Sequence, residues 1–394
     1  MHYLFVFIIL LLIVASLFRF DFFFYILYFF FGAYFLSRLW MDRALRAMEG
    51  SREYTSRAFP GEHVPVKLHL HNRGWLPVPW LQVRESLPIQ LKSPNSVRSV
   101  VSLLPKEQTT IDYVLDCRRR GYYRLGPLDL HTGDLFGMFE RGVTLSNEDY
   151  MIVYPRVVPL TQLGLPAQTP FGSVSTRQRL YEDPSRMTGV RDYQSGDSMR
   201  HIHWKTTATR GQLQVKRFEP AISVQAQILL NLRRSEYSVA RWEPATELGI
   251  VTAASIASYL VEKRQTVGLC CNGLDPLAET ATITALPPRQ GREQLTHILD
   301  VLARAQLGEE VPFAELLQQA HLHLTWGGTA VVITADAHET LFESLLHMAR
   351  SGFHVLLILT DPQTPVATVR GRAKEVGIEV YEVWEERDLD VWRS

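Results

Sequence analysis

Two apolar runs begin the chain. Residues 3–18 and 22–36 are almost entirely aliphatic or aromatic, with a break at Arg19–Asp21. Each run would form a helix of about 23 Å, which snorkelling arginines and flanking aromatics can extend toward the ~30 Å hydrocarbon core. One long tilted helix would instead bury the charges of the break in lipid. The pattern therefore predicts a transmembrane helical hairpin over residues 1–40.

Arginines after the second run set the expected orientation. Basic residues outnumber acidic ones there: Arg38, Arg43, Arg46 and Arg52 against Asp42 and Glu49. By the positive-inside rule both termini are cytoplasmic, which predicts a membrane protein whose soluble domains face the cytoplasm and whose residues 3–36 contact lipid. A cleaved signal peptide is the alternative, but no small-residue cleavage site separates the two runs. We expect residues 41–59 to be a juxtamembrane linker.

The pattern changes to period two over residues 60–155. Apolar side chains alternate with polar ones at Val64, Val66, Leu68 and Leu70, and again at Ile111, Tyr113 and Leu115. Turn clusters such as Asn72–Gly74 and Pro77–Pro79 separate the runs. Many short strands at this spacing predict an all-β, immunoglobulin-like sandwich. Within it, Arg118–Arg120 would either meet anionic lipid or an acidic partner, or pair with Asp134 and Asp129; we favour pairing.

Strands and helices alternate over residues 224–394. Continuous apolar strands are expected at 224–231, 266–271, 330–335, 353–360 and 378–384, and helices at 246–263, 313–321, 339–349 and 366–376, with helical spacing also around Leu295–Leu302. This order predicts an α/β domain with a doubly wound parallel sheet. Ligand sites in such sheets lie at the carboxyl ends of the strands. Those ends hold Asn231–Ser235, Asp336 and Asp361.

Residues 156–223 link the two predicted domains and contain a dense set of polar residue types. Gly196-Asp197 is typical of a turn, and the residues around His201 and His203 alternate like a short strand entering a core. The residues that we single out in this stretch are Tyr193, Gly196, Asp197, Arg200, His203, Trp204, Lys205, Ala208, Arg210, Phe218 and Glu219. No hydrophobic periodicity explains this set of residues. We call residues 156–223, which contain the set, the signature segment.

The signature segment resembles the motif of the bacterial family called domain of unknown function 58. The stretches Arg119–Pro127 and Gly133–Phe139 also resemble segments that precede the motif in membrane-anchored members. The resemblance implies a von Willebrand factor A-like C-terminal domain and a MoxR-type AAA+ ATPase as partner. In that fold an Asp-x-Ser-x-Ser loop and a later Asp hold a Mg²⁺-like ion. Here the corresponding positions are Asn231, Arg233, Ser235 and Asp336, so we expect no bound metal.

Four interpretations of the signature segment compete. His201 and His203 would share a face of a strand as metal ligands, or Asp197 and His203 would form an acid/base pair for hydrolysis. Nine basic against four acidic residues between Arg177 and Arg217 would suit a phosphate or an acidic protein surface. The favoured interpretation is structural: Arg200 and Lys205 pair with Asp197 or Glu219, and Trp204 fills a core.

Composition narrows the function further. Lys+Arg and Asp+Glu are both 41, so no charge excess favours nucleic acid, and the three cysteines form no CxxC pair. No phosphate-binding glycine loop is present, so neither a nucleotide cofactor nor a small-molecule substrate is expected. The sequence predicts a non-enzymatic membrane-anchored adaptor, and the family resemblance implies that it works with the ATPase in envelope or complex maturation. The alternative is a hydrolytic or metal-assisted enzyme using Asp197 and His203.

Overall fold

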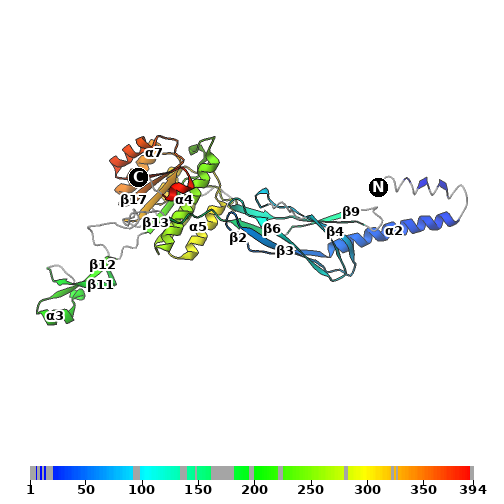
Figure 1. Ribbon diagram of the computed structural model, residues 1–394, viewed down its shortest axis with the longest axis horizontal. Coiled ribbons are helices and arrows are strands. Elements are labelled where there is room, and N and C mark those ends of the chain that lie inside the picture. Colours follow the sequence, from blue (N-terminus) through cyan, green and yellow to red (C-terminus); the bar gives the residue numbers. More distant parts are fainter. Residues whose placement is uncertain are drawn as a thin grey trace. The chain divides into compact units, whose positions relative to one another are not determined.

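The computed structural model describes residues 6, 9–10, 13–14, 21–91, 98–133, 140–146, 149–160, 182–194, 199–220, 225–278, 283–320, 324 and 327–390. Two compact units divide the chain, Met1–Arg156 and Val157–Ser394. It is a mixed α/β protein, with sandwich-like β-sheets in the first unit and a large sheet covered by helices in the second (Figure 1).

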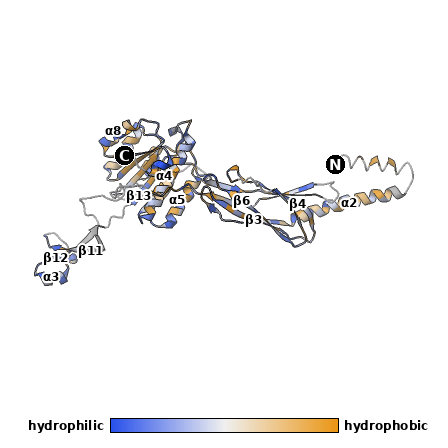
Figure 2. Ribbon diagram, viewed as in Figure 1, coloured by the Kyte–Doolittle hydropathy of each residue, from blue (hydrophilic) through white to orange (hydrophobic). Residues whose placement is uncertain are grey.

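Helix α2 (Asp21–Arg46) contains the second apolar run and continues ten residues beyond it. It is long and apolar enough to cross a membrane, and only 6% of its most apolar window is buried (Figure 2). The first arm of the expected hairpin, residues 3–18, lies largely outside the described residues. Among the described residues, one further helix has sufficient length and hydropathy, α4 (Trp242–Glu262); 83% of its most apolar window is buried in the second unit, so it is a core helix.

The expectation of a linker at residues 41–59 is wrong. Ala44, Leu45 and Met48 belong to the hydrophobic core of the sandwich, and only Ala47 separates α2 from strand β1 (Met48–Glu53). Ala44 and Leu45 lie in the last turn of α2, so this end of the helix is folded into the sandwich rather than leading up to it.

Three antiparallel or mixed sheets form the sandwich-like part, in the orders β1-β3-β6, β2-β10-β7 and β5-β4-β8-β9. Their remaining strands are β2 (Arg57–Ala58), β3 (His63–Asn72), β4 (Val78–Glu85), β5 (Arg98–Leu103), β6 (Gln108–Asp116), β7 (Gly121–Leu125), β8 (Leu128–Gly133), β9 (Glu140–Leu145) and β10 (Asp149–Val153). The alternation in β3 is confirmed, because Val64, Val66, Leu68 and Leu70 are all buried. Alternate residues of a strand share one face, so this set faces the core.

An antiparallel strand pair and a short helix make up the described part of the signature segment. Strands β11 (Glu182–Asp192) and β12 (Gln214–Pro220) pair, and helix α3 (Trp204–Arg210) lies in the connection between them. Ile202 bridges to Val215, and both are buried. A small apolar contact therefore fixes the helix to β12.

The second unit contains a six-stranded sheet in the order β15-β14-β13-β16-β17-β18. Its strands are β13 (Gln225–Leu230), β14 (Thr266–Cys271), β15 (Thr284–Arg289), β16 (Thr329–Thr334), β17 (His354–Thr360) and β18 (Glu379–Val383). All neighbours are parallel except β14 and β15. Five expected strands are confirmed within two residues at either end. The edge strand β15 was missed because Pro287 and Pro288 argue against a strand.

Helices cover both faces of this sheet. They are α4, α5 (Arg292–Arg304), α6 (Phe313–Ala320), α7 (Glu339–Arg350) and α8 (Val366–Val376). Apolar residues of α6, α7 and α8 form one core with Leu229 and Val332. On α4, an ideal Cβ at Gly249 would lie within 4 Å of Leu230 and Ile333, the next residues along the same strands. Because successive strand residues face opposite sides, α4 covers the other face.

Candidate functional site

The carboxyl ends of the parallel strands carry a buried hydrogen-bond network centred on Asn231. Its Nδ2 donates to Thr334 Oγ1 at 3.1 Å and to a carboxylate oxygen of Glu236. Its Oδ1 accepts from the Arg233 amide and from Asn272 Nδ2, each at 3.1 Å. Asn231 is fully buried, and both ends of its amide are used. The side chain that stands where the resemblance places a metal-binding carboxylate is therefore held by the chain itself.

Glu236 supplies the negative charge of this network. Burial raises the pKa of its carboxyl group, while the hydrogen bond from Asn231 and the charges of Arg233 and His338 lower it. The amide N–H of Asn231 is a good donor to the Glu236 carboxylate, whereas a carboxylate at position 231 would repel the Glu236 carboxylate. The Asn231–Glu236 pair thus needs no cation to be stable.

Two further carboxylates end neighbouring strands. Asp336 accepts from the Ala337 amide at 2.7 Å and from the Thr364 hydroxyl, and lies 3.2 Å from His338 Nε2. Asp361 lies 3.1 Å from Arg241 Nη1. Each acidic group has its own protein partner, which is what a structural network requires.

The expected metal-site positions are only partly brought together. Asn231 reaches Asp336 through Thr334, whose hydroxyl also donates to the Asp336 carbonyl at 3.1 Å. Ser235 is exposed and lies outside the network. Within the described ranges, no group of three or more histidine, cysteine, aspartate or glutamate side chains is arranged to hold a metal ion. What this network can do chemically is fix the loops that follow β13 and β16.

Asn272 is a member of the network that the sequence analysis missed. It follows β14 directly, donates to Asn231 and to the Val311 carbonyl at 3.1 Å, and accepts from the Leu232 amide at 2.6 Å. A signal existed: like Asn231, it is a polar residue placed immediately after a buried strand. Such a residue ends up at the same edge of the sheet.

The signature segment differs from its predicted conformation at His203. The expected strand is wrong, because His203 is the N-cap of α3: its Nδ1 accepts from the Thr206 amide at 3.2 Å and lies 2.8 Å from Thr206 Oγ1. Ser, Thr, Asn and Asp are the usual caps, so the histidine concealed the helix start. Gly211 ends the helix in the left-handed conformation with φ 68°. The spacing of His201 and His203 therefore does not place them on one strand face.

Trp204 does not fill a core in this structure. Its side chain is 67% exposed, so that expectation is wrong. Met199 and Leu213, which flank the helix in sequence, are 63% and 40% exposed. Lys205 and Arg210 are also exposed and make no ion pair with any described residue. The helix therefore presents an aromatic ring and two cations to its surroundings.

Other signature residues fall into two groups. Tyr193 donates its amide to the Leu213 carbonyl at 2.9 Å, and Ala208 is exposed on α3. Gly196 and Asp197, together with the side chains of Arg200, Phe218 and Glu219, lie outside the described residues. Their expected pairing remains a prediction. A partly buried polar contact joins Gln214 Nε2 to an Asp192 carboxylate oxygen, across the β11–β12 pair.

The basic cluster of the sandwich is partly paired. Arg118 Nε lies 2.8 Å from an Asp116 oxygen, two residues away. Asp129, one of the expected partners, instead accepts from the Thr144 hydroxyl at 2.8 Å, and Asp134 lies outside the described residues. The carbonyls of Arg119 and Arg120 both accept from the Tyr123 hydroxyl at 2.9 Å. The cluster thus closes the turn before β7.

Comparison with known sequences identifies the family. The pattern of the family described as "Protein of unknown function DUF58" matches residues 189–381, which include the signature segment from Tyr193 onward and the strand-end network. Residues 189–381 therefore belong to the DUF58 family. An uncharacterized protein of Bacillus subtilis (strain 168), YeaD, is 24% identical over 315 residues, covering 78% of this DUF58 chain and 74% of YeaD.

Two solved structures resemble parts of this chain, both with low scores. An aerotolerance-related membrane protein from Bacteroides fragilis matches 42% of the chain and 94% of its own length, with 16% identity and a TM-score of 0.30. The CARDB domain of the PF1109 protein from Pyrococcus furiosus, in complex with di-metal ions, matches 27% of the chain and 91% of its own length, with 19% identity and a TM-score of 0.20. At such scores we draw no argument from either.

Proposed function

We propose that this DUF58 protein is a membrane-anchored, non-enzymatic adaptor whose signature helix α3 binds a cytoplasmic protein. The observation that carries the proposal is the exposure of Trp204 beside Lys205 and Arg210. Tryptophan and arginine dominate the binding energy of protein interfaces. A family motif that keeps such a ring outside the core is better explained by a partner than by stability.

In this proposal α2 anchors the protein in a bacterial inner membrane, and the soluble units lie on the cytoplasmic side. Its apolar, largely exposed surface and the arginines at its C-terminal end support this orientation. A reporter fused to Ser394 that is active only in the periplasm would contradict it.

The partner we propose is a MoxR-type AAA+ ATPase, which the family resemblance implies, with a role in envelope or complex maturation. The order of the six-stranded sheet supports the finer interpretation of the second unit as von Willebrand factor A-like and the first as immunoglobulin-like. In that interpretation the Asn231–Glu236 hydrogen bond replaces the metal ion, so binding falls to other surfaces such as α3.

Binding to the purified ATPase tests the adaptor. The full chain in lipid nanodiscs would be titrated with the MoxR-type ATPase of the same genome. We expect Trp204→Ala to weaken binding about 30-fold, the effect of losing ~2 kcal/mol at an interface hot spot. Trp384→Ala, which removes a 41% exposed tryptophan from the second unit, is the matched control and should bind normally. Equal affinities for wild type and Trp204→Ala, or no binding by wild type, would refute the proposal.

The cations of α3 give a second readout in the same experiment. Lys205 and Arg210 favour an acidic partner surface, so affinity should fall as salt is raised and the charges are screened. Hydrolytic activity against phosphoester or peptide substrates that is lost only in His203→Ala would instead establish the enzyme alternative. The described contacts of His203 are those of a helix cap, and they favour the adaptor.

A further inference from the structure

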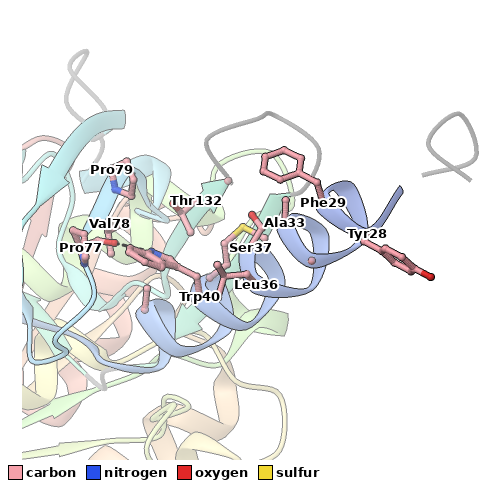
Figure 3. Close-up of a pocket in the computed structure, with 14 residues that line it drawn as sticks. Tyr28, Phe29, Ala33, Leu36, Ser37, Trp40, Pro77, Val78, Pro79 and Thr132 are labelled. Carbon is pink, nitrogen blue, oxygen red and sulfur yellow. Dashed lines mark hydrogen bonds between the residues drawn. The ribbon is translucent and has the colours of Figure 1, made fainter. Parts of the chain in front are cut away.

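An elongated pocket of about 480 Å³ lies between α2 and one end of the sandwich (Figure 3). On the helix side, its lining residues are adjacent pairs repeated every four residues from Tyr28 to Met41, followed by Ala44, which together form one continuous stripe. On the sandwich side, it is closed by Pro77–Pro79 at the start of β4 and by Thr132–Gly133 at the end of β8. The stripe covers 16 residue steps, or about 24 Å of helix, so the pocket is long and runs along the helix.

The lining is mostly apolar and carries no acidic or basic side chain. Two of its polar side chains are already hydrogen-bonded: the Trp40 indole donates to the Pro77 carbonyl at 3.0 Å, and the Thr132 hydroxyl donates to the Trp80 carbonyl. Figure 3 shows the Trp40 ring spanning from the helix to the Pro77 strand. The volume falls within the range of ~300–1,000 Å³ typical of small-molecule sites. A ligand that suits this pocket has a long apolar body.

The same end of the sandwich displays other features of a membrane interface. The turn between β3 and β4 is tied to the end of α2, because the Arg73 amide donates to the Ala47 carbonyl at 2.9 Å. In this region Trp75 is 73% exposed and Leu104 is 65% exposed. Tryptophans gather at the level of lipid headgroups, with apolar side chains immersed beside them. The pocket is therefore continuous with the lipid-facing surface of α2.

Positive charge lies at the end of the pocket nearest the sandwich. Arg43 and Arg46 are exposed on the last turns of α2 and make no ion pair with any described residue. Arg43 directly precedes Ala44, the last pocket-lining residue of α2, and lies outside the lining itself. Exposed arginines at this level suit the phosphate of a lipid headgroup.

We propose that the pocket between α2 and the β4/β8 end of the sandwich binds one acyl chain of a membrane phospholipid, with its phosphate toward Arg43. The site rests on the proposed membrane span of α2. It makes the lipid a structural part of the joint between anchor and sandwich, and it extends the apolar surface of α2 onto β4.

Photo-crosslinking tests the site. The full chain would be placed in vesicles of phosphatidylethanolamine and phosphatidylglycerol that contain a phospholipid with a diazirine in its acyl chain, and labelled peptides mapped by mass spectrometry. We expect label on the peptides containing Pro77–Pro79 and Thr132–Gly133. An ideal Cβ at Gly32 meets no atom within 4 Å, so Gly32→Trp can fill the pocket without a backbone clash. It should reduce that label roughly tenfold, equivalent to ~1.4 kcal/mol.

Matched variants separate the site from the anchor. Phe35→Trp adds bulk on a face of α2 outside the pocket lining and should leave the sandwich label unchanged. Gly32→Leu, a smaller insertion, should give an intermediate loss. Label on α2 near Phe35 without label on the sandwich peptides, or sandwich label that Gly32→Trp does not reduce, overturns the lipid site and leaves the span intact. No label on α2 overturns the span itself. Sandwich label from a diazirine fatty acid, with none from the phospholipid, overturns the phospholipid as occupant.

Discussion

Replacing Asn231 by aspartate should convert the most connected residue of the strand-end network into a source of repulsion. In the native chain the Asn231 amide donates to Glu236 and to Thr334, and neither its nitrogen nor its oxygen is exposed. Asn231→Asp keeps the shape and the acceptor oxygen. It replaces the donor with a second oxygen that faces a carboxylate.

The cost follows from two losses. A hydrogen bond to a charged group contributes ~1.5–3 kcal/mol. Two like charges about 4 Å apart repel by ~4 kcal/mol at the effective dielectric constant of a protein. Protonation of one carboxyl caps the sum, so we expect Asn231→Asp to destabilise the second unit by about 3–5 kcal/mol at neutral pH. Adding Glu236→Gln supplies an amide N–H that can donate to the new carboxylate at position 231. The double variant Asn231→Asp/Glu236→Gln should therefore recover most of the lost free energy of unfolding.

The effect should depend on pH with a definite sign. Burial already raises the pKa of Glu236 in the native chain, and a second carboxylate would raise the pKa of the pair further. When a carboxyl group has a higher pKa in the folded state than in the unfolded state, it stabilises the fold at pH values below its unfolded pKa. That stabilisation is lost as the pH rises through the folded pKa. The variant should therefore approach native stability near pH 4 and lose it toward pH 8.

Hydrogen exchange of the β13 and β16 amides, followed by mass spectrometry on the full chain, measures the local loss of stability in Asn231→Asp. Mg²⁺ or Mn²⁺ should slow exchange in Asn231→Asp and not in wild type, since two carboxylates and the Thr334 hydroxyl are ligands for a hard cation. Exchange in Asn231→Asp that matches wild type across this pH range would refute the network as described.

Three other outcomes are expected. Trp204→Ala should change stability by no more than about 0.5 kcal/mol in thermal denaturation, because the ring is exposed; a loss near 3 kcal/mol would restore the core interpretation. Cys117 and Cys270 are buried, and burial raises the pKa of each thiol from 9.0 to about 11. Alkylation of these thiols at pH 8 should therefore be slow until urea unfolds the protein. The free energy of unfolding should also fall as the pH rises from 9 through 11. Arg52→Met should cost about 3–5 kcal/mol in urea denaturation because it strands the buried Glu85 carboxylate, and Glu85→Leu added to it should recover part; near-native stability of Arg52→Met would contradict this.

Much of the second unit follows from the sequence because its signals are local. Continuous apolar strands such as β17, and the Gly377 cap of α8 with φ 75°, are set by neighbouring residues alone. The edge strand β15 does not follow, since its pairing with β14 tolerates the prolines that local rules count against a strand. Edge positions relax the requirement for a backbone N–H.

The signature segment is where sequence reasoning fails, and the reason is physical. An alternation of polar and apolar types around Ile202 fits both a strand and a helix start, and only the buried contact of Ile202 with Val215 decides between them. Similarly, the apolar spacing of Ala44, Leu45 and Met48 continues the helical pattern of α2, but that these residues join a β core depends on contacts far along the chain. Non-local packing sets both outcomes.

The two groups of polar residues in the second unit have opposite roles, and their exposure separates them. At the strand ends, Asn231, Asn272 and Asp336 are buried and hydrogen-bonded to one another or to neighbouring loops, so a substitution there is paid in stability. On α3, Trp204 and Lys205 are exposed, so their loss costs the fold little. Under the proposed function, these exposed side chains contact the partner. A variant that unfolds the sheet and a variant that abolishes binding should therefore map to different residues of the same family pattern.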